Sequence, residues 1–321
     1  MKSFTVNRND ADQRLDKFVL KNAPLLPQAL LYKYIRKGRI KINRKKGSIS
    51  TRLALGDIVE MYINDEFFEA KAKRYDFLSS PANLNIVYED ENILLADKPQ
   101  GLLVHPDKNE YRDTLIGRIK HYLYKKGEYQ PENENSFSPQ LANRIDRNTG
   151  GIVIAAKNAE ALRIICRIIK QREIDKWYLT IVHGIPKKKS DILTGYLFKD
   201  EKKNQVFLSN KKTESNRTVT TGYEVLASKN NLSLLKVRLY TGRTHQIRVH
   251  LSSIGHPLLG DGKYGKNAAD KKLGFVHQAL YSYKLKFDFK EDAGILEYLN
   301  GKEFTVNSVW FADKLFPECE Y

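Results

Sequence analysis

An aspartate flanked by two arginines is the feature of this sequence with the clearest chemical potential. Asp146 stands between Arg144 and Arg147, directly before the turn residues 148–151 and a short apolar run. The neighbouring cations favour the ionised carboxylate, and an ionised carboxylate at the mouth of a strand can act as a nucleophile or as a base. A structural ion pair that anchors the turn explains the same residues equally well.

Two other stretches match ligand-binding patterns without the context that those patterns need. The run 260–266 fits G-x-G-x-x-G and most of a phosphate-binding loop, but no buried strand precedes it and Asn267 stands where Ser or Thr would bind magnesium. His245 and His250 are five residues apart, which places them about 140° apart on a helix and on opposite faces of a strand. The sequence therefore predicts no nucleotide cofactor and no metal site.

The composition indicates a globular protein with a polyanionic partner. The chain has 321 residues, of which 41% are hydrophobic, and a net charge of +17. Such an excess favours nucleic-acid binding, although a solvated basic surface would have the same composition. No apolar run approaches the ~18 residues that a membrane span needs, the N-terminus lacks the apolar stretch of a signal peptide, and two cysteines cannot build a disulfide framework. We expect a cytoplasmic monomer without membrane contact.

Much of the net charge lies in residues 1–56, which carry 14 Lys and Arg against three Asp, a net charge of +11. This segment has the pattern of a small folded unit. Asp10 and Gln13 are spaced as a capping box for a first helix, Pro27 suits the start of a second, and Gly38 suits its end. A rigid basic corner after that helix can neutralise several phosphates, and a solubilising face is the alternative. The RNA-binding candidates at this corner are Arg36, Lys37, Arg39 and Lys41.

The N-terminal segment resembles a known module. The residues that carry the resemblance are Arg14-Leu15-Asp16-x-Phe18, Ile35-x-x-Gly38-Arg39-Ile40-x-Ile42-Asn43 and Gly56-Asp57. They are similar to the alpha-L RNA-binding motif of a small-subunit ribosomal protein, which implies binding of structured RNA. We expect an RNA-binding domain over residues 1–75, a linker over 76–83 and a second domain over 84–321.

The second domain has an α+β pattern in which strands dominate. We expect helices after Asn158 and after Thr244, and an exposed polar loop over residues 128–139. The strands are expected near residues 93–96, 151–156, 177–182, 232–239 and 279–289.

Three ordered motifs in this domain resemble the RluA family of RNA pseudouridine synthases over about residues 84–312. They are Arg144-Ile145-Asp146-Arg147-x-Thr149-x-Gly151, the run 240–251, and Gly255-His256-Pro257-Leu258-Leu259-Gly260-Asp261-x-x-Tyr264-Gly265; Lys98-Pro99-x-Gly101, His105-Pro106 and Lys176-x-Tyr178 also agree. The chain departs from the family pattern at Asn143, where His is usual, at Ile145 for Leu and at Gly150 for Ser, and residues 287–290 lack the usual His-Pro.

The resemblance implies both a fold and a set of roles. The fold is a mixed, mainly antiparallel sheet in two halves, flanked by helices. Asp146 is implied as the catalytic aspartate, with Arg248 pairing with it, and Tyr178 is implied to lie against the flipped base as a candidate for proton removal at C5. Arg144 is implied to fill the RNA stack where the base leaves. The residues implied as supporting or RNA-facing are Arg147, Arg243 and His245.

The implied reaction isomerises uridine, breaking the bond from C1′ to N1 and joining C5 to C1′. No redox change or group donor is involved, so no cofactor is expected. An anion beside C1′ could attack the sugar or remove the C2′ proton to give a glycal, and the sequence does not choose between them. The combination of domains favours large-subunit ribosomal RNA as substrate. The alternatives are a non-catalytic RNA-binding factor in ribosome assembly and a synthase acting on transfer RNA.

Overall fold

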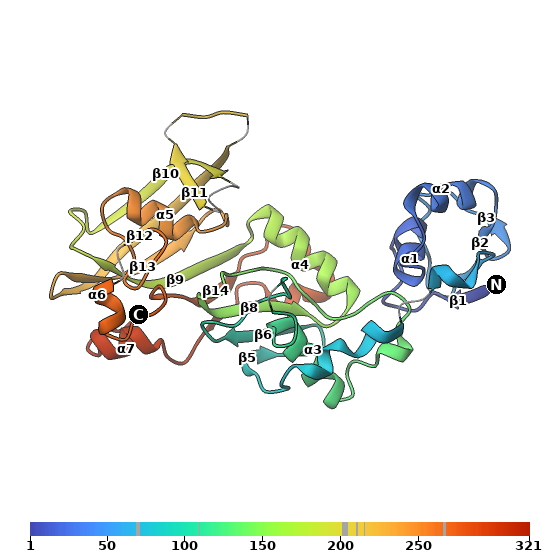
Figure 1. Cartoon of the computed structure of the whole chain (residues 1–321), viewed down its shortest axis with the longest axis horizontal. Coiled ribbons are helices and arrows are strands. Elements are labelled where there is room, and N and C mark those ends of the chain that lie inside the picture. The colour runs from blue at the N-terminus through green and yellow to red at the C-terminus, as the bar shows by residue number, and fades with distance from the viewer. Residues whose placement is uncertain (69–70, 109, 201–204, 210, 215, 266–267) are drawn as a thin grey trace.

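The computed structural model contains two sheets. A small sheet lies at the N-terminus, and an elongated sheet flanked by helices makes up the rest of the molecule (Figure 1). No helix in the described part of the chain is long and apolar enough to cross a membrane. The described residues are 1–68, 71–108, 110–200, 205–209, 211–214, 216–265 and 268–321.

The N-terminal unit packs two helices against a four-stranded sheet of order β1-β4-β2-β3. The apolar stripe of the first helix, Leu15, Phe18 and Val19, is fully buried against Leu31 and Ile35 of the second. Gly38 has a φ of +68° and ends that second helix, as predicted. The elements are β1 (Lys2–Thr5), α1 (Leu15–Asn22), α2 (Gln28–Arg36), β2 (Ile40–Ile42), β3 (Lys45–Lys46), β4 (Ile58–Met61) and the 3-10 segments η1 (Asp65–Phe68) and η2 (Lys71–Ser79).

The predicted capping box at Asp10 is wrong. Helix α1 begins at Leu15 with Arg14 in the N-cap position, and Asp12 adopts a left-handed φ of 63° that interrupts the chain before the helix. The Asp10 side chain is instead completely buried in the preceding turn, where the backbone N–H of Asn7 donates to Oδ2 at 3.1 Å.

The elongated sheet has eleven strands, with the continuous order β11-β10-β12-β13-β9-β14-β8-β6-β5; β15 pairs with β14, and β7 with β8. Its strands are β5 (Asn85–Glu89), β6 (Ile93–Lys98), β7 (Gln140–Leu141), β8 (Gly150–Ala156), β9 (Ile174–His183), β10 (Ser190–Asp200), β11 (Gln205–Ser209), β12 (Arg217–Lys229), β13 (Leu232–Leu239), β14 (Leu280–Phe287) and β15 (Glu303–Thr305). The helical segments around it are α3 (Leu115–Lys125), η3 (Pro131–Asn133), α4 (Ala159–Gln171), α5 (Gln246–Ser253), α6 (Ala268–Lys272), η4 (Gly294–Leu299) and α7 (Trp310–Leu315).

Strand β8 is apolar throughout because helices cover both faces of the sheet at this point. Ile152 and Ile154 face α4, whereas Val153 and Ala155 face α3. The predicted cap of α4 is confirmed, since the Asn158 side chain accepts a hydrogen bond from the N–H of Ala161 at 2.8 Å. The expectation of a mixed, mainly antiparallel sheet flanked by helices is confirmed.

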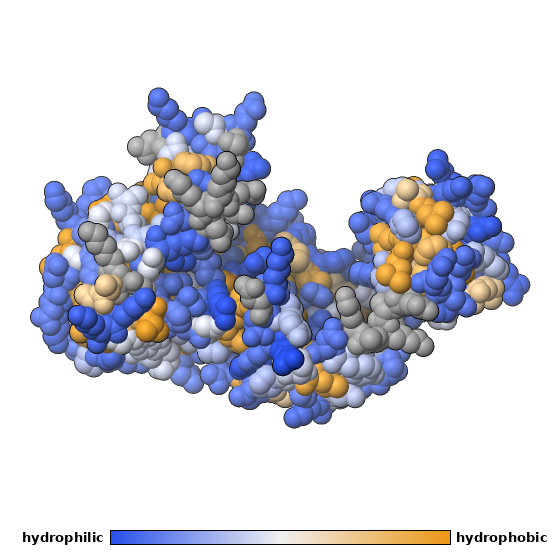
Figure 2. Space-filling view, in the orientation of Figure 1, coloured by the Kyte–Doolittle hydropathy of each residue, from blue (hydrophilic) through white to orange (hydrophobic). Residues whose placement is uncertain are grey.

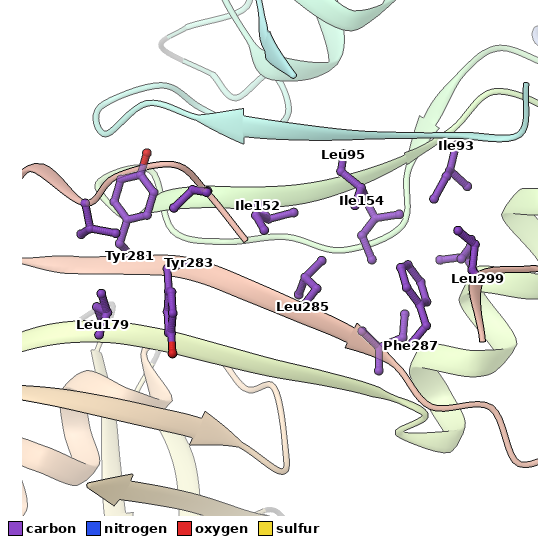
Figure 3. Close-up of a cluster of buried hydrophobic side chains, with 14 of the residues drawn as sticks. Ile93, Leu95, Ile152, Ile154, Leu179, Tyr281, Tyr283, Leu285, Phe287 and Leu299 are labelled. Carbon is purple, nitrogen blue, oxygen red and sulfur yellow. The ribbon is translucent and has the colours of Figure 1, made fainter. Parts of the chain in front are cut away.

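The two halves of the sheet meet where β8 and β14 run parallel for two residue pairs, Gly150 with Tyr281 and Gly151 with Ser282. A side chain at Gly151 would collide with the Ser282 carbonyl, and one at Gly150 with the Tyr281 ring. The glycine pair therefore permits the close approach that joins the halves. Figure 3 shows the apolar cluster across this junction, with Ile152 and Ile154 facing Leu285 on β14.

The polar loop over residues 128–139 is not simply exposed, contrary to the prediction. Tyr129, Pro131 and Phe137 are buried. The Tyr129 ring lies 5.7 Å from the Phe77 ring and packs with the apolar face of α3. The prediction was wrong because Glu134, Asn135 and Ser136, which lie between these buried residues, hydrogen-bond to side chains of the N-terminal unit.

Candidate active site

Asp146 lies in the segment that links β7 to β8, immediately before the glycine pair. The backbone N–H of Thr149 donates to the Asp146 carbonyl at 3.0 Å and closes a tight turn. Asn143, at the other end of the segment, accepts a hydrogen bond from the N–H of Ile154 at 2.8 Å and ties the loop to β8. The Asp146 side chain remains 28% exposed, so the carboxylate is held by the fold and is still open to solvent.

Arg248 joins two carboxylates in one chain of charges. Its Nε and Nη2 donate to the two carboxylate oxygens of Asp261 at 2.7 and 2.8 Å, and its Nη1 donates to Asp146 Oδ2 at 3.2 Å. Burial alone would lower the pKa of Arg248, but the bonds to Asp261 and the charge of Asp146 raise it overall. The planar guanidinium uses a bidentate pair to fix its own orientation, and this orientation directs the third bond to Asp146.

Asp261 is the member of this chain of charges that the sequence reasoning missed. It is 0% exposed and lies in the glycine-rich run that matched nucleotide-binding patterns. Burial raises the pKa of Asp261, but Arg248 and the backbone N–H groups of Lys263 and Tyr264 outweigh that effect and lower it. The run is therefore a tight turn around a buried carboxylate, and only its place in the resemblance to the RluA family marked it.

His245 lies beside the carboxylate without bonding to it. Its Nε2 is 3.8 Å from Asp146 Oδ2, and its Nδ1 is 2.8 Å from the Tyr264 hydroxyl. Burial is the main cause that lowers the pKa of His245, and the charge of Arg248 acts in the same direction. His245 has a left-handed φ of 55°. The buried Gln246 side chain supports this backbone, because Oε1 accepts from the Arg243 N–H at 3.1 Å and from the Thr241 hydroxyl at 2.9 Å.

Tyr178 forms part of the apolar side of the site. It lies on β9, paired with Ser282 on β14, and is buried with Ile145, Ile247 and Leu280. Burial raises the pKa of Tyr178 to about 12, and the nearby charge of Asp146 adds to the effect. The phenol therefore carries its proton at neutral pH.

A buried lysine, Lys98, hydrogen-bonds to the turn that carries Asp146. Lys98 is 0% exposed, and its Nζ donates to the carbonyls of Pro99, Leu102 and Arg147 at 2.8 to 2.9 Å. Burial lowers the pKa of Lys98 to about 7, against the opposing charge of Asp146. Lys98 thus ties the end of β6 to the loop that carries the aspartate.

Comparison with known proteins identifies the family to which this site belongs. The family model described as RNA pseudouridylate synthase matches residues 92–253, which include Asp146, Tyr178 and Arg248. An uncharacterized RNA pseudouridine synthase of Mycoplasma genitalium is 33% identical over 99% of this chain and 97% of its own length. The chain belongs to the RluA family of RNA pseudouridine synthases.

Two further comparisons agree with this assignment. Ribosomal large subunit pseudouridine synthase C of Haemophilus ducreyi is 30% identical, covering 90% of this chain and 88% of its own. Among solved structures, human RNA pseudouridylate synthase domain containing 4 has the same fold, with a TM-score of 0.59 and 20% identity over 77% of this chain and 98% of its own. The protein is therefore an RNA pseudouridine synthase, an isomerase.

Three arginines of the synthase project from loops around the carboxylate. Arg144, Arg147 and Arg243 are exposed. Arg147 Nε donates to the Gly101 carbonyl at 3.0 Å. Burial is the main cause that lowers the pKa of His105, and the charge of Arg144 acts in the same direction. The structure places all three arginines at the surface of the region that contains Asp146, Arg248 and His245.

The basic corner of the synthase lies in the N-terminal unit and does not join this site (Figure 1). Arg36, Lys37 and Arg39 are exposed and Lys41 is half-buried. Arg39 lies over the Tyr34 ring at 5.2 Å and Lys41 over the Tyr62 ring at 5.3 Å. No ion pair of the described residues includes any of these four cations, so their charge is available to a polyanion.

Proposed function

We propose that this synthase isomerises specific uridines of large-subunit ribosomal RNA, in the cytoplasm, and holds that RNA through its N-terminal unit. Two kinds of relative support the substrate. Ribosomal large subunit pseudouridine synthases C of Haemophilus ducreyi and D of Borreliella burgdorferi align with 90% and 89% of this chain. Alignments of that length extend beyond the catalytic segment into the N-terminal unit, where exposed cations can displace counterions from RNA phosphates.

The observation that carries the catalytic proposal is the chain of charges from Asp261 through Arg248 to Asp146. It holds one carboxylate at an open position while the other members are buried, which is what an aspartate needs in order to reach the ribose of a substrate. Asp146 acts on the sugar in one of two ways, by attack at C1′ or by removal of the C2′ proton. In both routes the bond from C1′ to N1 breaks, the uracil turns, and C5 bonds to C1′.

Tyr178 supplies the surface against which the detached uracil lies. Its side chain is buried in the free protein, and its raised pKa keeps the hydroxyl protonated there. Before it can accept the C5 proton, Tyr178 must therefore lose its own proton, and the negative charge of Asp146 opposes that loss.

The exposed arginines take part in extruding the base. A uridine inside a helical stack must leave it before the sugar is accessible, at a cost of a few kcal/mol. We assign Arg144 to the vacancy in the stack, because it is exposed two residues from Asp146. Arg147, Arg243 and His245 contact the RNA around the flipped nucleotide.

The test uses purified protein, large-subunit ribosomal RNA and a transfer RNA pool, with pseudouridines mapped by carbodiimide modification and primer extension. We expect new pseudouridines in the ribosomal RNA with wild-type protein and none with Asp146→Asn. Modification confined to transfer RNA would overturn the substrate, and modification by Asp146→Asn would overturn the catalytic assignment.

A further inference from the structure

The N-terminal unit is attached to the rest of the synthase twice, once through the chain and once through a polar contact. The covalent connection is short, because Phe68 packs in the N-terminal core while Phe77 packs against α3. A tether alone would leave the unit free to rotate about it. A second contact at a different point removes that rotation.

The second contact is centred on Asp10. Asn135 Nδ2 donates to its Oδ2 at 2.6 Å and the Ser136 hydroxyl donates to its Oδ1 at 2.5 Å. Asn135 also donates to the Thr5 carbonyl at 2.8 Å, and Gln13 donates to the Ser136 hydroxyl at 2.7 Å. A fully buried carboxylate needs such donors, and Asn135 and Ser136, on the other side of the contact, supply two of them beside the N–H of Asn7.

Asn9 extends the contact to helix α4. Its Nδ2 donates to Glu134 at 2.7 Å, and its Oδ1 accepts a hydrogen bond from the backbone N–H of Ala159 at 3.1 Å. Ala159 is the first residue of α4, so an asparagine of the N-terminal unit satisfies one of the unpaired donors at that helix terminus. Arg163, one turn further, lies 3.8 Å from Asp12.

Both surfaces that receive the N-terminal unit flank the strand that carries the Asp146 turn. The loop 133–136 runs into β7, which pairs with the last residues of β8, and α4 follows directly after β8. Asp146 lies four residues before Gly150, the first residue of β8. The strand has seven residues and at ~3.3 Å per residue spans about 23 Å. One rigid strand therefore connects the contact to the catalytic turn.

We propose that the contact of Asn9 and Asp10 with loop 133–136 and α4 is a specificity determinant that fixes the distance between the RNA held by the N-terminal unit and Asp146. This inference rests on the proposed function. Hydrogen bonds are directional, so a contact built from them selects one orientation. Figure 2 shows a hollow between the N-terminal unit and the rest of the molecule, the space across which the RNA would run. Only uridines at the matching distance from the bound structure reach the carboxylate.

The test compares two Asn→Ala variants of the same loop in the full-length protein. Asn135→Ala removes the donor to Asp10 and Thr5, whereas Asn133→Ala is the matched control, because Asn133 is exposed and it is its backbone oxygen that accepts from Asn7. A third variant, Asn9→Ala, breaks the contact from the other side. Circular dichroism and thermal unfolding verify that each variant folds.

Two measurements decide the outcome. In X-ray scattering of the protein alone, Asn135→Ala and Asn9→Ala should increase the radius of gyration, and Asn133→Ala should not. With large-subunit RNA their kcat/KM should fall about tenfold or the set of modified uridines should change, while a stem-loop too short to reach the N-terminal unit is modified at the wild-type rate.

An unchanged radius of gyration, or an unchanged rate and site profile on the long RNA, overturns the inference. Equal losses on the long RNA and the stem-loop also overturn it, because they indicate damage to the catalytic site. If wild-type protein modifies no uridine in any RNA, the proposed function fails instead, and the scattering result still reports on the contact.

Discussion

The two charged regions of this protein use the same residue types in opposite ways. At the basic corner of the N-terminal unit, Arg36, Lys37 and Arg39 are exposed and Lys41 is half-buried, and no ion pair of the described residues includes any of them. At the site, Arg248 is buried and bonded to two carboxylates. Exposed charges act together at a distance and are screened by salt, whereas a buried and bonded charge acts on one partner.

This difference predicts which substitutions should lower the catalytic rate and which should lower the affinity for RNA. Charge at the basic corner is interchangeable, since any cation near a phosphate displaces a counterion. Charge at the site is tied to one geometry. The four predictions below test that division in order of decreasing effect.

The largest effect is expected from Asp146→Asn. The substitution keeps the size and most of the contacts of the side chain but removes the carboxylate oxygen that we propose attacks C1′ or accepts the C2′ proton. Turnover should fall by ~10³-fold or more, while RNA affinity in a filter-binding assay stays within about twofold. A matching loss of affinity would mean that Asp146 serves binding, and the division between the two regions would fail.

Asp261→Asn should damage both stability and activity. It leaves Arg248 buried with one charged partner in place of two, and breaking a buried ion pair costs about 3 kcal/mol of unfolding free energy. The loss of orientation at Arg248 should lower kcat by about 100-fold. Urea unfolding and single-turnover kinetics measure the two effects.

The matched control is Asp191→Asn, which breaks the exposed pair with Lys188 at 2.9 Å. An exposed pair contributes less than about 1 kcal/mol, and this one lies away from the catalytic turn. Equal effects of the two substitutions would contradict the role given to burial.

Removing the charge of the basic corner should weaken RNA binding and make the affinity less dependent on salt concentration. Replacement of Arg36, Lys37, Arg39 and Lys41 by Ala should lower RNA affinity and flatten the slope of log K against log salt by about 3, because each neutralised phosphate contributes ~0.7 to 0.9. The rate on a saturating short stem-loop should stay unchanged. The control replaces the exposed residues Lys229, Lys271, Lys272 and Lys302 and should leave more of the slope intact. A similar flattening in both would show that only net charge matters.

The smallest effect for a single step in the test is a pH dependence of the unfolding free energy, which arises from Lys98. Its pKa is lowered to about 7 in the folded protein, below the ~10.4 of an unfolded lysine. Between these values the unfolded chain binds more protons, so stability rises with pH, on the order of 1 kcal/mol per pH unit. The unfolding free energy of wild type minus that of Lys98→Met should therefore increase from pH 7 to pH 10 in urea titrations. A constant difference would contradict the role of burial.

Local pattern was sufficient for much of the fold. The cap at Asn158, the end of α2 at Gly38 and the strand after Gly151 were all predictable, because caps, glycine conformations and apolar periodicity depend on neighbours in sequence. The same reasoning failed at Asp10, where a capping pattern was present but the side chain found its donors in Asn135 and Ser136, more than 120 residues away. Nothing local distinguishes these two uses of an aspartate.

In the candidate active site, too, some features were predictable from the sequence and others were not. Asp146 and its flanking arginines were identifiable from residue type and from the resemblance to the RluA family, whereas the buried partner Asp261 lay in a run whose spacing suggested a different ligand. The sequence by itself determined which groups are available: a carboxylate before a turn, a basic N-terminal segment, and glycines where two strands must meet. Only the tertiary structure decided which of those groups touch, since Arg248 and Asp146 are 102 residues apart. Packing, and not propensity, sets which charge is buried, which is paired, and which stays open to the RNA.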